Sequence, residues 1–213
     1  MKYDMLNVNN TDPILKIRTD RLQLKTPCLT DAGPMHDSIN ASFSDIYPWL
    51  PWATKDITIE DCENHIKYFI QCHNSERPHC LFFHIWHNVS NNFIGSVYFG
   101  QIEWRNPAFS IGYWLDSREV NNGYMREAVN ALAHVAFQHF KANRIEISTS
   151  KDNFPSRKIP EKLNFDLEAE LKSHHINYTT LAISSTLVYA CIDFYKLPKS
   201  THSWTTPDNE EHR

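Results

Sequence analysis

The chain has 213 residues, of which 41% are hydrophobic and 13% aromatic, which is enough for one globular domain with a full core. A formal net charge of −4 excludes the strongly basic surface that attracts nucleic acid, and no apolar run approaches the roughly 20 residues of a membrane span. The N-terminal residues lack the apolar segment of a signal peptide, so a cytoplasmic protein is expected.

The N-terminal third of the chain predicts one strand and two helices. Residues 1–12 are expected to form a flexible arm, and the apolar alternation of 14–26 predicts a strand. Residues that favour helix caps begin the segment 30–40 and indicate a short first helix. The aromatic, proline-rich sequence YPWLPWA (47–53) predicts a shaped loop. An apolar face recurs at helical spacing over 58–73, which predicts a second helix with Thr58 as its cap.

The middle of the chain predicts three strands and a helix. Apolar runs at 80–86, 93–102 and 108–115 are separated by short polar turns, which indicates antiparallel hairpins. A polar turn and an amphipathic helix follow. The residues expected on the buried stripe of this helix are Met125, Val129, Leu132, Ala136 and Phe140.

The last third of the chain predicts strands at 144–149, 165–172 and 180–195, with a proline-containing helix at 154–165. The unit from 108 to 149 should be a parallel β-α-β crossover. A polar, disordered tail is expected over 197–213, so a single domain would span 13–196. The predicted fold is α+β, with a mixed sheet of about seven strands and about four helices.

Cysteine and histidine usage gives no sign of a metal site. Five cysteines without CxxC spacing favour reduced, mostly buried thiols. His84 and His87 lie three apart on a predicted strand, so they would point to opposite faces. His134 and His139 are five apart, which does not suit one metal on a helix. No metal ligand set is therefore expected.

Several motifs, in this order, resemble those of a known family. They are RTDRLQLK, YPWLPWA, IGYWLD, GYMREAV, NRIEI and NFPSRKIPEKLNF. They resemble the GCN5-related N-acetyltransferase (GNAT) superfamily, and within it the ribosomal-protein N-acetyltransferases of the RimJ/RimL type. The resemblance covers about residues 14–195.

The resemblance implies a site for acetyl-coenzyme A where two parallel strands separate. The pantetheine would pair with strand backbone, and the pyrophosphate would sit at a helix N-terminus, where unpaired N–H groups and the helix dipole favour an anion. The implied cofactor residues are Tyr113, Trp114, Leu115 and Asp116 on the strand, Val120, Asn121, Asn122, Gly123, Tyr124 and Met125 in the loop, and Asn153 and Ser156 on the following helix.

The phosphate loop departs from the family pattern at two positions. Val120 replaces a Gln or Arg, and Asn121 replaces a glycine. Asparagine tolerates left-handed backbone better than other non-glycine residues, so the loop can keep its shape. Asn164 likewise stands where the family has glycine, at a position suited to a left-handed helix end.

The resemblance also suggests catalytic residues. Ser156 matches a proposed general acid toward the coenzyme A thiolate, although a helix cap is the structural alternative. His175 falls where the related enzymes have a glutamate base, and imidazole titrates near neutrality. Glu103 is a second candidate base. A solvated turn histidine and an exposed hairpin carboxylate are the respective alternatives. A backbone N–H around Trp114 and Leu115 would serve the oxyanion.

The acceptor is expected to be an amine. Trp49 and Trp52 are expected to wall the acceptor groove, although one of them could instead fill the core. The preferred acceptor is a ribosomal or other protein N-terminus. A small amine such as a polyamine or antibiotic is an alternative, and so is a non-catalytic protein that binds acyl-coenzyme A or a partner. Monomer and homodimer both remain open.

Overall fold

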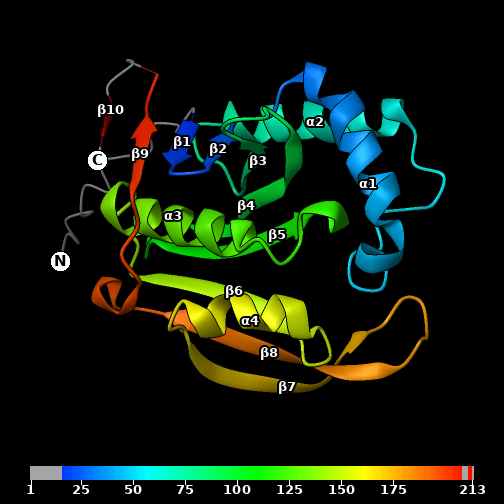
Figure 1. The fold of residues 1–213 in the computed structure, drawn as a ribbon. Coiled ribbons are helices and arrows are strands. Elements are labelled where there is room, and N and C mark those ends of the chain that lie inside the picture. Colours follow the sequence, from blue (N-terminus) through cyan, green and yellow to red (C-terminus); the bar gives the residue numbers. More distant parts are fainter. Residues whose placement is uncertain (1–15, 208–210, 213) are drawn as a thin grey trace.

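The computed structural model describes residues 16–207 and 211–212, so the arm predicted over 1–12 lies outside the described residues. Ten strands of the described residues form one mixed sheet in the order β10-β9-β1-β2-β3-β4-β5-β6-β8-β7 (Figure 1). The strands are β1 (Lys16–Thr19), β2 (Leu22–Lys25), β3 (Leu81–His87), β4 (Phe93–Glu103), β5 (Ala108–Leu115), β6 (Arg144–Ser150), β7 (Asp166–Ile176), β8 (Ile183–Cys191), β9 (His202–Thr205) and β10 (Glu211–His212).

Four α-helices lie against this sheet in two groups. Alternate residues of the strands, such as Phe83 and Ile85, pack against α3, whereas Trp86 and Trp114 belong to the cluster formed with α1 and α2. Side chains of a strand point alternately to its two faces, so the two groups cover opposite faces. The helices are α1 (Ala32–Ile46), α2 (Ile59–His73), α3 (Tyr124–Gln138) and α4 (Phe154–Lys162). Within 16–207, none of them combines the length and apolar character that crossing a membrane needs.

Most elements form where the sequence predicts them. Thr58 caps α2 by accepting the Asp61 N–H at 3.1 Å. The residues expected on the stripe of α3 are all buried, although Phe140 lies just beyond the end of the helix. The strands β3, β4 and β5 pair antiparallel as predicted. The first helix is longer than expected, with 15 residues. The mixed α/β architecture is confirmed, with more strands than the seven expected.

Residues 16–25 form a hairpin, so the prediction of one strand over 14–26 was wrong. β1 and β2 pair antiparallel, with Ile17 opposite Leu24. The hydroxyl of Thr19 accepts the Leu22 N–H at 3.0 Å and closes the turn. Leu22 lies five positions after Ile17, and this odd spacing breaks the period of two that a single strand would keep.

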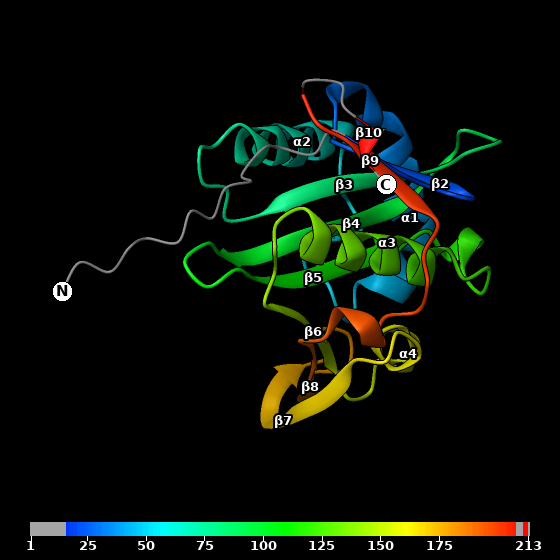
Figure 2. The same cartoon turned by 90° about the vertical axis from the view of Figure 1, so that its left-hand side faces the viewer.

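The tail predicted to be disordered instead contributes strands to the sheet. β9 pairs antiparallel with β1, which places Trp204 opposite Ile17, and the Trp204 side chain is buried. β9 and β10 lie at the opposite end of the molecule from β7 and β8 (Figure 2). The prediction failed because β9 pairs with a strand almost 190 residues earlier in the chain, and the polar composition around Trp204 gives no sign of that pairing.

The strands β5 and β6 separate along their length, and this opening positions the site. The predicted parallel crossover is confirmed, but pairing is confined to Ala108–Ser110 of β5 with Arg144–Glu146 of β6. Beyond this point β5 bonds to β4, and β6 bonds to β8. Residues 111–115 and 147–150 therefore flank what we call the β5–β6 opening.

Candidate active site

A tyrosine of β5 reaches across the β5–β6 opening to α4. The Tyr113 hydroxyl donates to the Ser156 carbonyl at 3.0 Å and lies 3.2 Å from Ser156 Oγ. Burial raises the pKa of the Tyr113 phenol, so the hydroxyl keeps its proton at neutral pH. The structure therefore brings together Tyr113, which the resemblance assigned to cofactor binding, and Ser156, which it assigned to both cofactor binding and catalysis.

The first turn of α4 leaves the Ser156 hydroxyl available. Asn153 is the N-cap, and its side-chain oxygen accepts the Ser156 N–H at 3.2 Å. The capping role that was the structural alternative for Ser156 thus belongs to Asn153. Ser156 is half-buried, with its hydroxyl directed to Tyr113.

The side chains at the end of β5 have different surroundings. Trp114 is only 6% exposed and packs in the α1–α2 cluster, on the face opposite Tyr113. Asp116 is buried, and it accepts hydrogen bonds from the Arg118 backbone at 2.8 Å and from the Arg118 guanidinium at 2.6 Å. Burial acts to raise the pKa of Asp116, but these hydrogen bonds outweigh it and leave the pKa below its ordinary value. Asp116 therefore shapes the turn that leads to the loop.

The loop before α3 has the backbone that its sequence predicted. Asn121 has φ 64°, and Gly123, the N-cap of α3, has φ 79°, so both are left-handed. Asn164 is also left-handed, with φ 61°. Val120 is 47% exposed and makes no polar contribution where related loops have Gln or Arg.

Two arginines flank this loop, and neither was predicted from the sequence as a site residue. A Cβ built on Gly123 would lie 3.6 Å from Arg21 Nη2 and 3.9 Å from Arg126 Nη2. Arg21 donates to the Asn122 carbonyl at 2.9 Å and pairs with Glu127 at 2.6 Å. This pairing neutralises the carboxylate nearest the N-terminus of α3. Arg21 lies in the β1–β2 turn, and no local sequence signal could place it here.

A pocket of about 410 Å³ adjoins the two arginines. It lies between the first turns of α3, the end of α4 and residues 198–201. Four cationic side chains and two acidic side chains line it, so the pocket carries a net positive charge. The charged lining residues are Arg21, Arg126, Lys162, Lys199, Asp20 and Glu127.

The strand register places His175 near the end of β6. Ser184 of β8 pairs with His175, and Thr186 pairs with Ser150, the last residue of β6. The β7–β8 ladder shifts register between Leu171 and His175, and such a bulge redirects the side chains that follow it. The Nε2 atom of His175 is buried without a hydrogen-bond partner. Burial lowers the pKa of His175, and His174 adds to this, while Asp152 acts in the opposite sense. The neutral imidazole is therefore the dominant form at neutral pH.

The two tryptophans of the aromatic loop face different neighbours. Trp49 stacks on His175, with ring centroids 6.0 Å apart and planes at 22°. Trp52 instead contacts Trp114 edge-on, at 6.0 Å and 67°. The Tyr178 N–H donates to the Pro48 carbonyl at 3.1 Å, which joins the β7–β8 turn to this loop. The two rings thus have different neighbours, and only Trp49 contacts His175.

Glu103 lies away from these residues. It pairs with Ala108 at the beginning of β5, whereas Leu115 ends that strand. Seven residue steps of about 3.3 Å separate Ala108 from Leu115, which is roughly 20 Å. The Glu103 carboxylate accepts the Arg105 N–H at 2.8 Å within its own turn. The structure therefore brings Tyr113 and Ser156 into contact and places Glu103 far from them.

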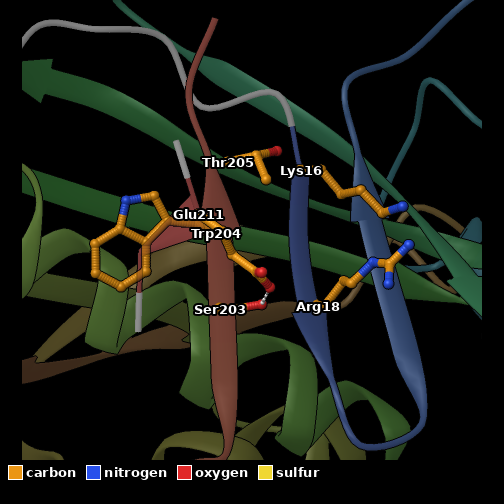
Figure 3. Close-up of a pocket in the computed structure, with 6 residues that line it drawn as sticks. All are labelled: Lys16, Arg18, Ser203, Trp204, Thr205 and Glu211. Atoms are coloured by element: carbon orange, nitrogen blue, oxygen red, sulfur yellow. Dashed lines mark hydrogen bonds between the residues drawn. The ribbon is translucent and has the colours of Figure 1, made fainter. Parts of the chain in front are cut away.

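A second hollow, of about 180 Å³, lies at the β1–β9–β10 edge of the sheet (Figure 3). Lys16 and Arg18 point away from Trp204 there, and Ser203 donates to Glu211 at 2.9 Å. Four other strands separate β1 from β6 in the sheet order, so this hollow is remote from the opening.

Comparisons with known proteins agree with this geometry. A family model for the acetyltransferase (GNAT) domain matches residues 21–166. The ribosomal-protein-serine acetyltransferase of Escherichia coli (strain K12) is 26% identical over 154 residues, which cover 72% of this chain and 84% of that protein. A RimL ribosomal L7/L12 α-N-protein acetyltransferase in complex with coenzyme A superposes with a TM-score of 0.74 at 24% identity, covering 83% of this chain and 96% of that one.

A microcin C7 self immunity acetyltransferase, MccE, in complex with acetyl-CoA and AMP also has a TM-score of 0.74, at 22% identity over 82% of this chain and 93% of that one. At these identities the solved structures establish the fold. The family model covers more than half of the chain, and it confirms the relationship that the motifs predicted. The chain therefore belongs to the GNAT acetyltransferase family, and its reaction class is N-acetyl transfer.

Proposed function

We propose that this protein transfers an acetyl group from acetyl-coenzyme A to the α-amine of a protein N-terminus. The name of the similar solved structure, a ribosomal L7/L12 α-N-protein acetyltransferase in complex with coenzyme A, supports this acceptor. The observation that carries the proposal is the stack of Trp49 on His175 beside the β5–β6 opening. The stack places an aromatic surface, on which a peptide can pack, next to a neutral imidazole, which can accept a proton from an amine.

The residues around the loop fit an anionic cofactor. Left-handed backbone at Asn121 and Gly123 turns the chain into the N-terminus of α3, where the first N–H groups have no helical acceptor. Arg21 and Arg126 flank Gly123, and Arg21 neutralises Glu127. We infer that the phosphates of coenzyme A bind here and extend into the cationic pocket of about 410 Å³.

The β5–β6 opening can hold the pantetheine arm that carries the acetyl thioester. Beyond Ser110, one backbone edge of β5 bonds to β4 and the other faces the opening. The free edge offers donors and acceptors that a pantetheine amide can pair with, and a backbone N–H around Leu115 is suited to the oxyanion. Bound acetyl-coenzyme A supplies an activated acetyl thioester.

Two proton-transfer roles follow from the side chains. We assign the general base to His175, because its buried Nε2 has no competing partner and burial lowers its pKa. An α-amine has a pKa near about 8, so a weak base is sufficient to deprotonate it. We assign the general acid to Ser156. The protonated Tyr113 hydroxyl, 3.2 Å from Ser156 Oγ, orients it and can return its proton.

The acceptor class is tested by following the release of free thiol from acetyl-coenzyme A and the mass of the product. Candidate acceptors are short peptides with free N-termini, the same peptides with blocked N-termini and an internal lysine, polyamines and aminoglycosides. We expect turnover only with free N-termini. Turnover confined to the small amines would replace this acceptor with the small-amine alternative. No turnover with any amine, together with cofactor binding, would favour the non-catalytic alternative.

A further inference from the structure

Three side chains that can bind a metal meet where α2 leads into β3. Cys72 lies in the last turn of α2, and His79 and Cys80 directly precede β3. The Sγ atoms of Cys72 and Cys80 are 3.0 Å apart, and one ligand atom from each of the three residues lies within 4.8 Å of the others. The sequence predicted no such set, because the ligands come from the two ends of a connecting loop.

The cluster is enclosed on one side and open on the other. Cys72 and Cys80 are only 4% and 6% exposed, whereas His79 is exposed. Tyr68 lies one helical turn before Cys72. Its hydroxyl is 3.0 Å from His79 Nε2 and 3.8 Å from Cys80 Sγ. A cation here would meet protein ligands on the core side and have access to water on the outer side.

We propose that Cys72, His79 and Cys80 form a structural site for a thiophilic divalent cation of the zinc class. Two thiolates and an imidazole are ligands that zinc takes, and water or the Tyr68 hydroxyl can complete a tetrahedral set. Binding forms two metal–sulfur bonds and releases one proton from each thiol. The two thiolate charges then cancel the charge of the cation, so a neutral assembly lies against the core.

A disulfide is the alternative fate of the same two cysteines, whose Sγ atoms are 3.0 Å apart. A disulfide would join Cys72 and Cys80 alone and would not involve His79. A cation would take all three side chains, whose ligand atoms lie within 4.8 Å of one another.

The site would act on the fold and not on acetyl transfer. The His79 carbonyl accepts the Ile102 N–H at 3.1 Å, and the Pro78 carbonyl accepts the Trp104 indole N–H at 2.8 Å. These contacts place the cluster beside the β4–β5 turn, at the end of β5 opposite Leu115. A bound cation would fasten the loop 74–80 to α2, independently of the proposed acetyl transfer.

The test uses the reduced full-length protein, freed of metal by a chelator and titrated with Co²⁺ and then with Zn²⁺. We expect thiolate-to-cobalt charge-transfer absorption that saturates at one ion per chain and disappears as Zn²⁺ is added. Free Zn²⁺ at 100 times its Kd should raise Tm by about 5–10 °C. Cys72→Ser and Cys80→Ser should abolish both signals, and His79→Gln should weaken them.

Two other buried cysteines provide matched controls. Cys62→Ala and Cys191→Ala remove other buried thiols and should leave the cobalt signal unchanged. His79→Gln alters an exposed loop residue, so it keeps the test valid if the serine variants misfold. Cobalt binding that survives Cys72→Ser, or that is unaffected by His79→Gln, would overturn the site. The site would also be overturned if the chain bound no metal and its mass were lower by two hydrogens, because the two cysteines would then form a disulfide.

Discussion

The Trp49 indole stacks on the His175 imidazole, with centroids 6.0 Å apart and planes at 22°. The two residues are separated by more than 120 positions in the chain. The backbone hydrogen bond from Tyr178 to Pro48 holds their segments together. The stack buries part of the imidazole, which lowers its pKa, and it places an aromatic surface next to the candidate base.

The first prediction concerns this base. His175→Gln keeps a polar side chain but removes the titrating group, so kcat/KM should fall by about 10²-fold or more at neutral pH. The loss should shrink at high pH, where the acceptor amine is already neutral. Because burial lowers the pKa of His175, the acidic limb of the wild-type pH profile should lie below about 6.5. Glu103→Gln is the matched control, and a larger loss in that variant would move the base to β4.

The acceptor surface is tested by comparing the two tryptophans. Trp49→Ala should raise KM for a peptide acceptor by about 3–10-fold, which corresponds to the loss of one aromatic contact. Trp52→Ala should change KM less, because that ring contacts Trp114 instead of His175. Steady-state kinetics with varied peptide give both values. Equal effects would mean that the acceptor contacts both rings or neither.

The pair of Ser156 and Tyr113 predicts a graded loss of rate. Ser156→Ala should lower kcat by about 10²–10⁴-fold and leave cofactor affinity nearly unchanged, since a general acid acts in the transition state. Tyr113→Phe removes the contacts of the Tyr113 hydroxyl with the carbonyl and the hydroxyl of Ser156 but leaves Ser156 itself, so a smaller loss of about 5–10-fold is expected. Single-turnover kinetics with calorimetric cofactor affinities separate these effects. A kcat near wild type in Ser156→Ala would contradict the assignment.

Gly123 tests the phosphate cradle. Acetyl-coenzyme A at 100 times its Kd should raise the Tm of the wild type by about 5–10 °C. Gly123→Val should remove this shift, because a branched residue is strained at φ 79° and its side chain prevents close approach to the backbone. Gly123→Asn tolerates the backbone but still adds a side chain, so it should also lose most of the shift. Gly33→Ala, where a Cβ meets nothing within 4 Å, is the control that should keep it.

Acid should destabilise the fold below about pH 6.5. Burial lowers the pKa of five histidines, so the unfolded chain binds more protons than the folded chain as the pH falls below the ordinary histidine value. Stability is thus full above that pH and is lost progressively below it. These residues are His65, His73, His134, His175 and His202.

We expect Tm to fall by about 5 °C between pH 7 and pH 5, since each kcal/mol corresponds to about 2–4 °C in a chain of this size. Differential scanning calorimetry at closely spaced pH values measures this. His134→Gln can keep the hydrogen bond to the Pro198 carbonyl but does not titrate, so it should reduce the slope. A Tm that stays constant or rises toward pH 5 would contradict the prediction.

Most local elements, the family and the loop conformation follow from the sequence. Caps, apolar periodicity and the left-handed tolerance of Asn121 and Asn164 are properties of neighbouring residues, so they can be read without a fold. The parallel crossover between β5 and β6 followed from the same local patterns and a general rule of handedness.

Which distant residues meet follows only from the packing of the folded chain. Arg21 reaches Gly123 from a turn about 100 residues earlier, Trp204 completes the sheet beside β1, and Trp49 rather than Trp52 contacts His175. The cysteine pair at 72 and 80 depends likewise on how one loop folds back. Such contacts arise from the packing of whole elements, in which burial and strand register outweigh local conformational preference. The pattern within one segment does not specify which distant residue it will contact.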